Sequence, residues 1–239
     1  MRQRKRVLIL DYGLGNAPTL LNALEFHGVK ASTTSLLTND DLDAVVFLPG
    51  VGAFDAGVNL LHSSGNFHFL KHAVLNPDFN LIGICLGMQC AVVEYARNVL
   101  NLADAHTTEI NPNTSNPVID LMDHQKKVTE KGGTMRLGAY SCQVEEDSKA
   151  FECYQKVNIK ERHRHRYEFN NDYKEKLESS GMKTTGLNPE SNLVEIIEIA
   201  EHPWFVGVQF HPEYKSTVAN PQPLFVGFIA AAITYSKHH

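Results

Sequence analysis

One cysteine lies between two glycines at the point where the sequence pattern changes from strand-like to helix-like. Residues 81–84 form an apolar run of strand length, and residues 88–97 repeat apolar side chains at helical spacing. A thiol in a tight strand-to-helix turn is placed as a nucleophile, and the following helix N-terminus stabilises negative charge on sulfur. We therefore predict that Cys85 is the nucleophile of a covalent mechanism, with the backbone N–H of Leu86 in its oxyanion hole.

The other cysteines provide a comparison for this assignment. The alternative for Cys85 is a small buried core residue, the usual role of a cysteine in apolar sequence. Cys90 lies inside the predicted helix without flanking glycines, so we expect it to be part of the core. The four cysteines show no CxxC spacing and no secretory signal precedes them, so we expect reduced thiols in a cytoplasmic protein. They are Cys85, Cys90, Cys142 and Cys153.

A histidine and a glutamate follow the most apolar stretch of the second half of the chain. Residues 204–210 predict a strand that leads into His211, Pro212 and Glu213. Residues two apart in an extended segment face the same side, and the proline disfavours a helical backbone at His211. We predict that His211 takes the thiol proton and that Glu213 orients the imidazole. The alternative is a plain surface turn.

Arginine and histidine alternate at residues 162–166. In a strand Arg162, Arg164 and Arg166 would share one face, and His163 and His165 would share the other. Guanidinium groups in such a cluster bind carboxylates or phosphates. Two histidines without a carboxylate or thiol at matching spacing do not form a metal site. The alternative is a solvated basic loop.

Strand-like and helix-like segments alternate along the chain, which predicts an α/β fold with a parallel sheet and crossover helices. Ligand sites in such sheets lie beyond the carboxyl ends of the strands, where the turns at Asp11, Gly50 and Cys85 fall. The predicted strands are residues 7–10, 30–34, 44–48, 81–84, 138–144, 159–169, 193–199 and 204–210, and the predicted helices are residues 19–26, much of 53–75, 88–97, 173–180 and 224–235.

Length and composition limit the classes of protein to consider. A chain of 239 residues with 43% hydrophobic and 21% charged residues can form one large domain over residues 1–239. The formal charge of −5 gives no reason to expect nucleic-acid binding. No apolar run approaches the ~20 residues of a membrane-spanning helix. The turn at Gly13 lacks the third glycine of a dinucleotide-binding fingerprint, so we expect no nucleotide cofactor there.

Several of these runs resemble the class I glutamine amidotransferases, which share a three-layer, flavodoxin-like fold with a twisted, mostly parallel sheet flanked by helices. From about residue 81 to residue 232 the chain resembles the glutaminase domain of CTP synthase, on runs such as GICLGMQCAVVEYARN, ERHRHRYEFNN and HPWFVGVQFHPEYKS. Residues 7–61 instead resemble the glutaminase subunit of imidazole glycerol phosphate synthase, on DYGLGNAPTLLNALEFHG and LPGVGAF.

The resemblance implies roles for individual residues and no metal or organic cofactor. Glu109 would face the ammonium group of L-glutamine and Arg166 its α-carboxylate. The implied nucleophile is Cys85, the base is His211, the orienting carboxylate is Glu213, the oxyanion hole is formed by Leu86, Gly50 and Val51, and the substrate is held by Gln89, Glu109 and Arg166.

The implied activity is hydrolysis of L-glutamine to glutamate and ammonia, with the ammonia passed to a separate synthase subunit. The ATP- and UTP-binding synthase domain of CTP synthase has no counterpart in the sequence, and the loop at Gly50 resembles that of a subunit that is a poor glutaminase until its partner binds. Of the pathways that could accept the ammonia, pyrimidine nucleotide synthesis is favoured over histidine synthesis. Two alternatives remain open: hydrolysis of another γ-glutamyl compound, and a non-catalytic regulatory subunit.

Overall fold

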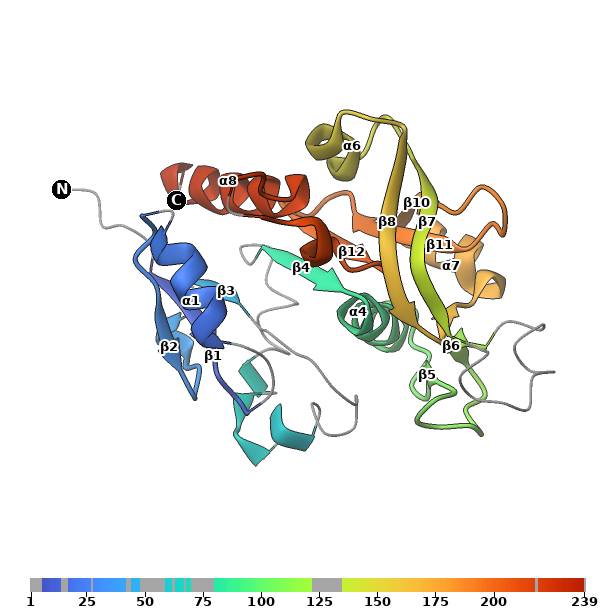
Figure 1. The fold of residues 1–239 in the computed structure, drawn as a ribbon. Helices are drawn as coiled ribbons and strands as arrows, with labels where there is room; N and C mark the ends of the chain where they lie inside the picture. Colours follow the sequence, from blue (N-terminus) through green and yellow to red (C-terminus); the bar gives the residue numbers. More distant parts are fainter. Residues whose placement is uncertain are drawn as a thin grey trace. The chain divides into compact units, whose positions relative to one another are not determined.

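The structure is a computed structural model that describes most of the chain, in two compact units. Met1–Asn80 with Ile229–His239 form the first unit, and Leu81–Phe228 form the second. Figure 1 labels the elements of each unit. The predictions for Gly50, for Val51 and for most of the helix at 53–75 lie outside the described residues, and the single domain over 1–239 stays a prediction. The described residues are 6–13, 17–26, 28–41, 44–47, 59–61, 63–66, 68–69, 80–121, 135–217 and 219–238.

The first unit contains a small parallel sheet with β1 in its centre. β1 pairs in parallel with β2 on one edge and with β3 on the other, as the alternating strand and helix patterns predict. Leu8 and Leu10 of β1 are buried in the core of this unit. Its described elements are β1 (Val7–Leu10), α1 (Ala17–Phe26), β2 (Ser32–Thr34), the short 3-10 helix η1 (Asn39–Asp41) and β3 (Val45–Phe47).

The second unit is built on a six-stranded sheet. β4 and β12 run parallel, but the other neighbouring strands run antiparallel, which corrects the prediction of a mostly parallel sheet. The reason is connection length: the short segments 188–193 and 200–204 reverse the chain, whereas a parallel neighbour needs a crossover of roughly a dozen residues or more. In sheet order the strands are β4 (Leu81–Ile84), β12 (Phe205–Val208), β11 (Val194–Ile199), β10 (Met182–Leu187), β7 (Arg136–Val144) and β8 (Asn158–His165).

The described part of the second unit also contains a three-stranded sheet and four helices, of which α8 continues past Phe228 into the C-terminal segment. α4 contacts β4 and β12 of the large sheet and all three strands of the small one, so the helix that begins beside Cys85 is packed against both sheets (Figure 1). The sequence patterns did not predict β6, β10 and α6. These elements are β5 (His106–Thr107), β6 (Pro117–Asp120), β9 (Glu168–Phe169), α4 (Leu86–Asn98), α6 (Lys149–Tyr154), α7 (Lys174–Ser179) and α8 (Pro223–His238), with the 3-10 helices η3 (Asn171–Tyr173) and η4 (Pro212–Lys215).

The arginine–histidine segment is a strand with its histidines inside. Side chains of β8 alternate strictly between exposed and buried, and His163 and His165 are on the buried face. Arg162 and Arg164 are exposed, but β8 ends at His165, so Arg166 lies beyond the strand in a half-buried turn. The prediction that the three arginines share one face is therefore corrected for Arg166.

No helix among the described residues is long and apolar enough to span a membrane.

Candidate active site

Cys85 occupies a single-residue turn between β4 and α4, as its glycine-flanked position predicts. Its backbone has φ 52° and ψ −105°, a conformation that costs a residue with a side chain about 1–3 kcal/mol. The turn is held by a hydrogen bond from the N–H of Cys85 to the carbonyl oxygen of Val208, at 2.6 Å. α4 begins at the next residue, Leu86, so the first N–H groups of the helix lie beside the thiol.

Only one of the two flanking glycines is required by packing. A Cβ atom on Gly83 would lie 2.9 Å from the carbonyl carbon of Gly87, which is a backbone atom, whereas a Cβ atom on Gly87 would meet no described atom within 4 Å. We expect Gly83→Ala to lower the free energy of unfolding by about 1–3 kcal/mol. Gly87→Ala is the matched control and should raise it by up to ~1 kcal/mol, because alanine is the better helix former.

Urea unfolding of the two variants beside the wild-type protein measures this difference. Equal stability of the two alanine variants would show that the close backbone approach at Gly83 does not constrain the turn.

His211 and Glu213 follow β12 and lie together at the edge of β8. The N–H of His211 donates to the carbonyl oxygen of Arg162 at 2.8 Å, and the Lys215 ammonium donates to the carbonyl oxygen of Lys160 on the same strand. His211 Nδ1 lies 2.6 Å from Glu213 Oε1. Because a carboxylate accepts, Nδ1 carries the proton of that bond.

The second nitrogen of the His211 ring is directed to the thiol side. Burial alone would lower the pKa of His211, but hydrogen bonds and charge from Cys85 and Glu213 outweigh it and raise the pKa to about 10. Nε2 is buried and forms no well-aligned hydrogen bond with a described residue. The ring also stacks on Tyr214, with centroids 5.0 Å apart and an interplanar angle of 21°.

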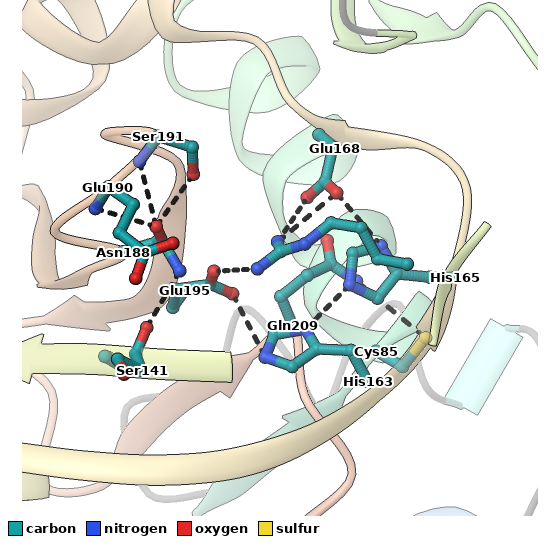
Figure 2. A network of polar contacts seen from close by, with 12 residues as sticks. Cys85, Ser141, His163, His165, Glu168, Asn188, Glu190, Ser191, Glu195 and Gln209 are labelled. Atoms are coloured by element: carbon teal, nitrogen blue, oxygen red, sulfur yellow. Dashed lines mark hydrogen bonds and ion pairs between the residues drawn. The ribbon is translucent and has the colours of Figure 1, made fainter. Parts of the chain in front are cut away.

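Two buried glutamine side chains connect the thiol to the chain after β8. Gln209 Nε2 donates to Cys85 Sγ at 3.8 Å, and Gln209 Oε1 accepts from Gln89 Nε2 at 3.2 Å. Gln89 Nε2 also donates to the carbonyl oxygen of Tyr167 at 2.8 Å. Figure 2 shows Gln209 beside Cys85. Gln209 was not among the predicted site residues, although its position two residues before His211 was a usable signal.

Glu109 and Arg166 meet at a tyrosine that was not predicted either. Burial raises the pKa of Tyr167, the charge of Glu109 raises it further, and the charge and hydrogen bond of Arg166 lower it. Glu109 and Arg166 therefore both lie near the Tyr167 side chain; Glu109 is exposed, and Arg166 and Tyr167 are half-buried. The structure thus brings six of the predicted site residues into the second unit as one neighbourhood, together with the N–H of Leu86. Those six are Cys85, Gln89, Glu109, Arg166, His211 and Glu213.

Arg136 lies between two buried carboxylates on the interior side of this neighbourhood. Its guanidinium is 3.3 Å from Glu168 Oε1 and 2.8 Å from Glu195 Oε1. Burial raises the pKa of Glu168, Arg136 opposes this and Glu195 adds to it, with a resulting pKa of about 8. Two buried carboxylates that face one guanidinium thus favour a proton on Glu168.

The raised pKa of Glu168 predicts a pH dependence of stability. Its ordinary pKa is 4.5 and its folded pKa about 8, so the folded state binds the proton more tightly than the unfolded state. This contribution is fully present below pH 4.5 and is lost as the pH rises through about 8. Thermal unfolding between pH 5 and 9 should show a decline in Tm that Glu168→Gln, which cannot ionise, makes shallower. Parallel curves for the two proteins would contradict a raised pKa.

Among the described residues, no group of three histidine, cysteine, aspartate or glutamate side chains is arranged to hold a metal ion.

Comparison with known proteins places this neighbourhood in a family. A family model described as glutamine amidotransferase class-I matches residues 8–231. The chain belongs to the class I glutamine amidotransferases. The amidotransferase is 62% identical to the CTP synthase of Cytophaga hutchinsonii and 56% identical to that of Christiangramia forsetii, each over 195 residues that make up 82% of this chain. It spans only about a third of those relatives, 35% and 34% of their length.

Solved structures agree with the family assignment. The glutaminase domain of Trypanosoma brucei CTP synthase, solved with bound acivicin, superposes on this amidotransferase with a TM-score of 0.76 and 27% identity, covering 97% of this chain and 94% of that one. A putative GMP synthase subunit from Thermoplasma acidophilum has a TM-score of 0.63 at 16% identity, covering 99% and 98%, and supports the fold alone. The predicted class I amidotransferase fold is thereby confirmed, and the predicted similarity to CTP synthase extends over more than the C-terminal two-thirds.

Proposed function

We propose that this amidotransferase hydrolyses L-glutamine to L-glutamate and ammonia through a γ-glutamyl thioester on Cys85. The observation that carries the proposal is the placement of Cys85 in the strained turn before α4, together with the His211–Glu213 pair at 2.6 Å. Cys85 and Glu213 raise the pKa of His211 to about 10. An imidazolium beside sulfur is the arrangement that prepares a thiolate nucleophile. Catalytic hydrogen bonds of this kind are commonly loose until substrate binds, which fits a His211 Nε2 that has no well-aligned hydrogen bond to a described residue.

The proposed reaction has two balanced steps. In the first, the Cys85 thiolate attacks the side-chain amide carbon, the C–N bond breaks, and the amide nitrogen takes the His211 proton and leaves as ammonia. In the second, a water molecule gives a proton to His211 and its oxygen attacks the thioester, which releases glutamate and the thiolate. The N–H of Leu86 at the start of α4 donates to the tetrahedral oxyanion, and one such donor contributes about 3 kcal/mol to lowering the barrier. Gly50 and Val51 are proposed to supply the second donor.

The amino-acid end of glutamine is proposed to bind where Glu109 and Arg166 meet at Tyr167. A carboxylate and a guanidinium that both lie near one tyrosine complement the ammonium and the α-carboxylate of an α-amino acid. Gln89, fixed by the carbonyl oxygen of Tyr167, lies between this pair and Cys85. We further propose that the ammonia is used by a CTP-forming synthase, because the relatives that this chain matches are CTP synthases.

Ammonia and glutamate released from L-glutamine by the purified protein test the proposal directly. The assay is repeated with larger γ-glutamyl amides, and Cys85 is examined by mass spectrometry after treatment with acivicin. We expect hydrolysis of glutamine in preference to the larger amides and acivicin on Cys85 alone. If the protein hydrolyses a larger γ-glutamyl amide in preference to glutamine, then that amide, and not glutamine, is its substrate. Absence of both glutamine turnover and acivicin labelling, with and without cell extract to supply a partner, would refute the proposed enzymatic activity.

A further inference from the structure

Five buried ionisable side chains form a closed ring of contacts inside the second unit (Figure 2). Arg136 contacts Glu168 and Glu195, as described above, and His163 Nδ1 lies 2.8 Å from His165 Nε2. His165 Nδ1 lies 3.4 Å from Glu168 Oε1, and His163 Nε2 lies 3.7 Å from Glu195 Oε2, a contact without a hydrogen bond that completes the ring. All five side chains are less than a tenth exposed.

The direction of the histidine hydrogen bonds follows from one acceptor. His165 Nδ1 also lies 3.2 Å from the carbonyl oxygen of Tyr167, and a carbonyl oxygen can only accept, so His165 carries its proton on Nδ1. His165 Nε2 is then an acceptor, and His163 must donate to it from Nδ1. Burial lowers the pKa of His163 to about 3 and that of His165 well below its usual range, so both rings are neutral at physiological pH.

Two members of the ring, His165 and Glu168, flank the turn that carries Arg166. His165 is the last residue of β8 and Glu168 the first of β9, so only Arg166 and Tyr167 lie between them. Through Arg136 and Glu195 the ring ties both ends of this turn to β7 and β11. The Tyr167 carbonyl oxygen accepts from His165 and from Gln89 at once. The ring and the substrate-side residues therefore share one backbone atom.

We propose that the ring of Arg136, His163, His165, Glu168 and Glu195 is a positioning device that holds the Arg166–Tyr167 turn in the geometry that receives the α-carboxylate of the substrate. The inference rests on the proposed glutamine hydrolysis. Its members are positioning residues, because they reach the substrate only through the turn. Apolar side chains of similar volume would stabilise a sheet core as well as a buried ionic group does, or better. The ring therefore contributes a fixed turn rather than stability.

The test compares L-glutamine with L-glutaminamide, in which a carboxamide replaces the α-carboxylate. The wild-type protein should favour glutamine in kcat/KM by roughly ten- to a hundredfold, the value of a charged hydrogen-bonded contact. Glu168→Leu opens the ring. It should raise KM for glutamine about tenfold or more and leave kcat at saturation within about threefold. It should also reduce the preference for glutamine over glutaminamide in kcat/KM to about threefold or less. His165→Phe, which keeps an aromatic ring, is the second opening variant in case the first fails to fold.

Two further variants separate positioning from general weakening of the core. Glu168→Gln keeps polar atoms on both sides of the position and should retain most of the preference. The Tyr154 hydroxyl donates to Glu161 of β8 at 3.1 Å, outside the ring. Tyr154→Phe removes that hydrogen bond and should not change the preference for glutamine over glutaminamide. Unchanged KM and preference in the opened variants, or a fall in kcat alone for both substrates, would overturn the positioning role.

Binding measurements distinguish failure of the ring from failure of the proposed activity. Calorimetry on the Cys85→Ala protein compares the two ligands without turnover, with and without Glu168→Leu. A wild-type protein that does not hydrolyse glutamine, but whose Cys85→Ala form shows a ring-dependent preference in binding, contradicts only the activity. A wild-type enzyme whose opened variants keep the preference contradicts only the ring. Absence of glutamine binding in the Cys85→Ala protein overturns both.

Discussion

Replacing Cys85 with alanine is expected to lower kcat for glutamine hydrolysis by about four to six orders of magnitude. The thiolate is the atom that forms the covalent bond, and no other described thiol is placed to substitute for it. Burial raises the pKa of Cys90 to about 12 and that of Cys153 to about 11, and it also raises the pKa of Cys142. These thiols stay protonated at neutral pH and are poor nucleophiles.

The matched control for this experiment is Cys90→Ala, which removes the thiol five residues further along the chain, inside α4. Ammonia release by this variant should stay close to that of the wild-type protein, because the buried Cys90 thiol stays protonated and takes no part in the proposed reaction. Both variants are measured by steady-state ammonia release in a coupled assay, with enzyme concentrations that span at least five decades. Substantial residual activity in the Cys85→Ala protein would rule out the thioester route.

Replacing His211 with asparagine is expected to lower kcat by about two to four orders of magnitude, the contribution of a positioned general acid–base group. The imidazolium must give its proton to the departing ammonia, so activity should fall as the pH rises through the His211 pKa of about 10. The pH profile of kcat/KM should therefore show an alkaline limb near pH 10 in the wild-type protein. This limb should be missing in the asparagine variant.

Glu213→Gln provides the graded comparison for His211. The Glu213 side chain is 44% exposed, so water screens its charge, and its loss should lower kcat less than the loss of the imidazole. It should also move the alkaline limb to lower pH, because one of the two groups that raise the His211 pKa is gone. An alkaline limb that is the same in all three proteins would assign that ionisation to a group other than His211.

The sequence was sufficient for features that depend on local spacing. The turn at Cys85 follows from glycine placement within a few residues. His211 and Glu213 were predicted to lie together and do so, but Glu213 is in the 3-10 helix η4, so the extended segment on which that prediction was based is wrong. The alternation of β8 is local too, and the buried position of His163 and His165 agrees with it. Membership of the family was also recognisable, because its motifs are short continuous runs around these residues.

Features that depend on distant parts of the chain were not predictable in the same way. The antiparallel pairing of β10 depends on which strands meet, not on the pattern within any one of them. Gln209 was identified from its contact with Cys85, although its position two residues before His211 was a local signal, and Tyr167 was identified from its contact with Gln89. The ring depends on Arg136 and Glu195, which come from separate strands and have no motif. Contacts of this kind are selected by packing across the sheet and leave no periodic signal in the sequence.

The hydrogen bonds that His211 and Lys215 make to β8 have an effect on association between molecules. β8 is the last strand of the described sheet, and an open strand edge is a template on which another chain can add and aggregate. The carbonyl oxygens of Arg162 and Lys160 are already taken by His211 and Lys215. The segment that brings the imidazole to the thiol thus also covers part of this edge, and removes two acceptors that an added strand would need.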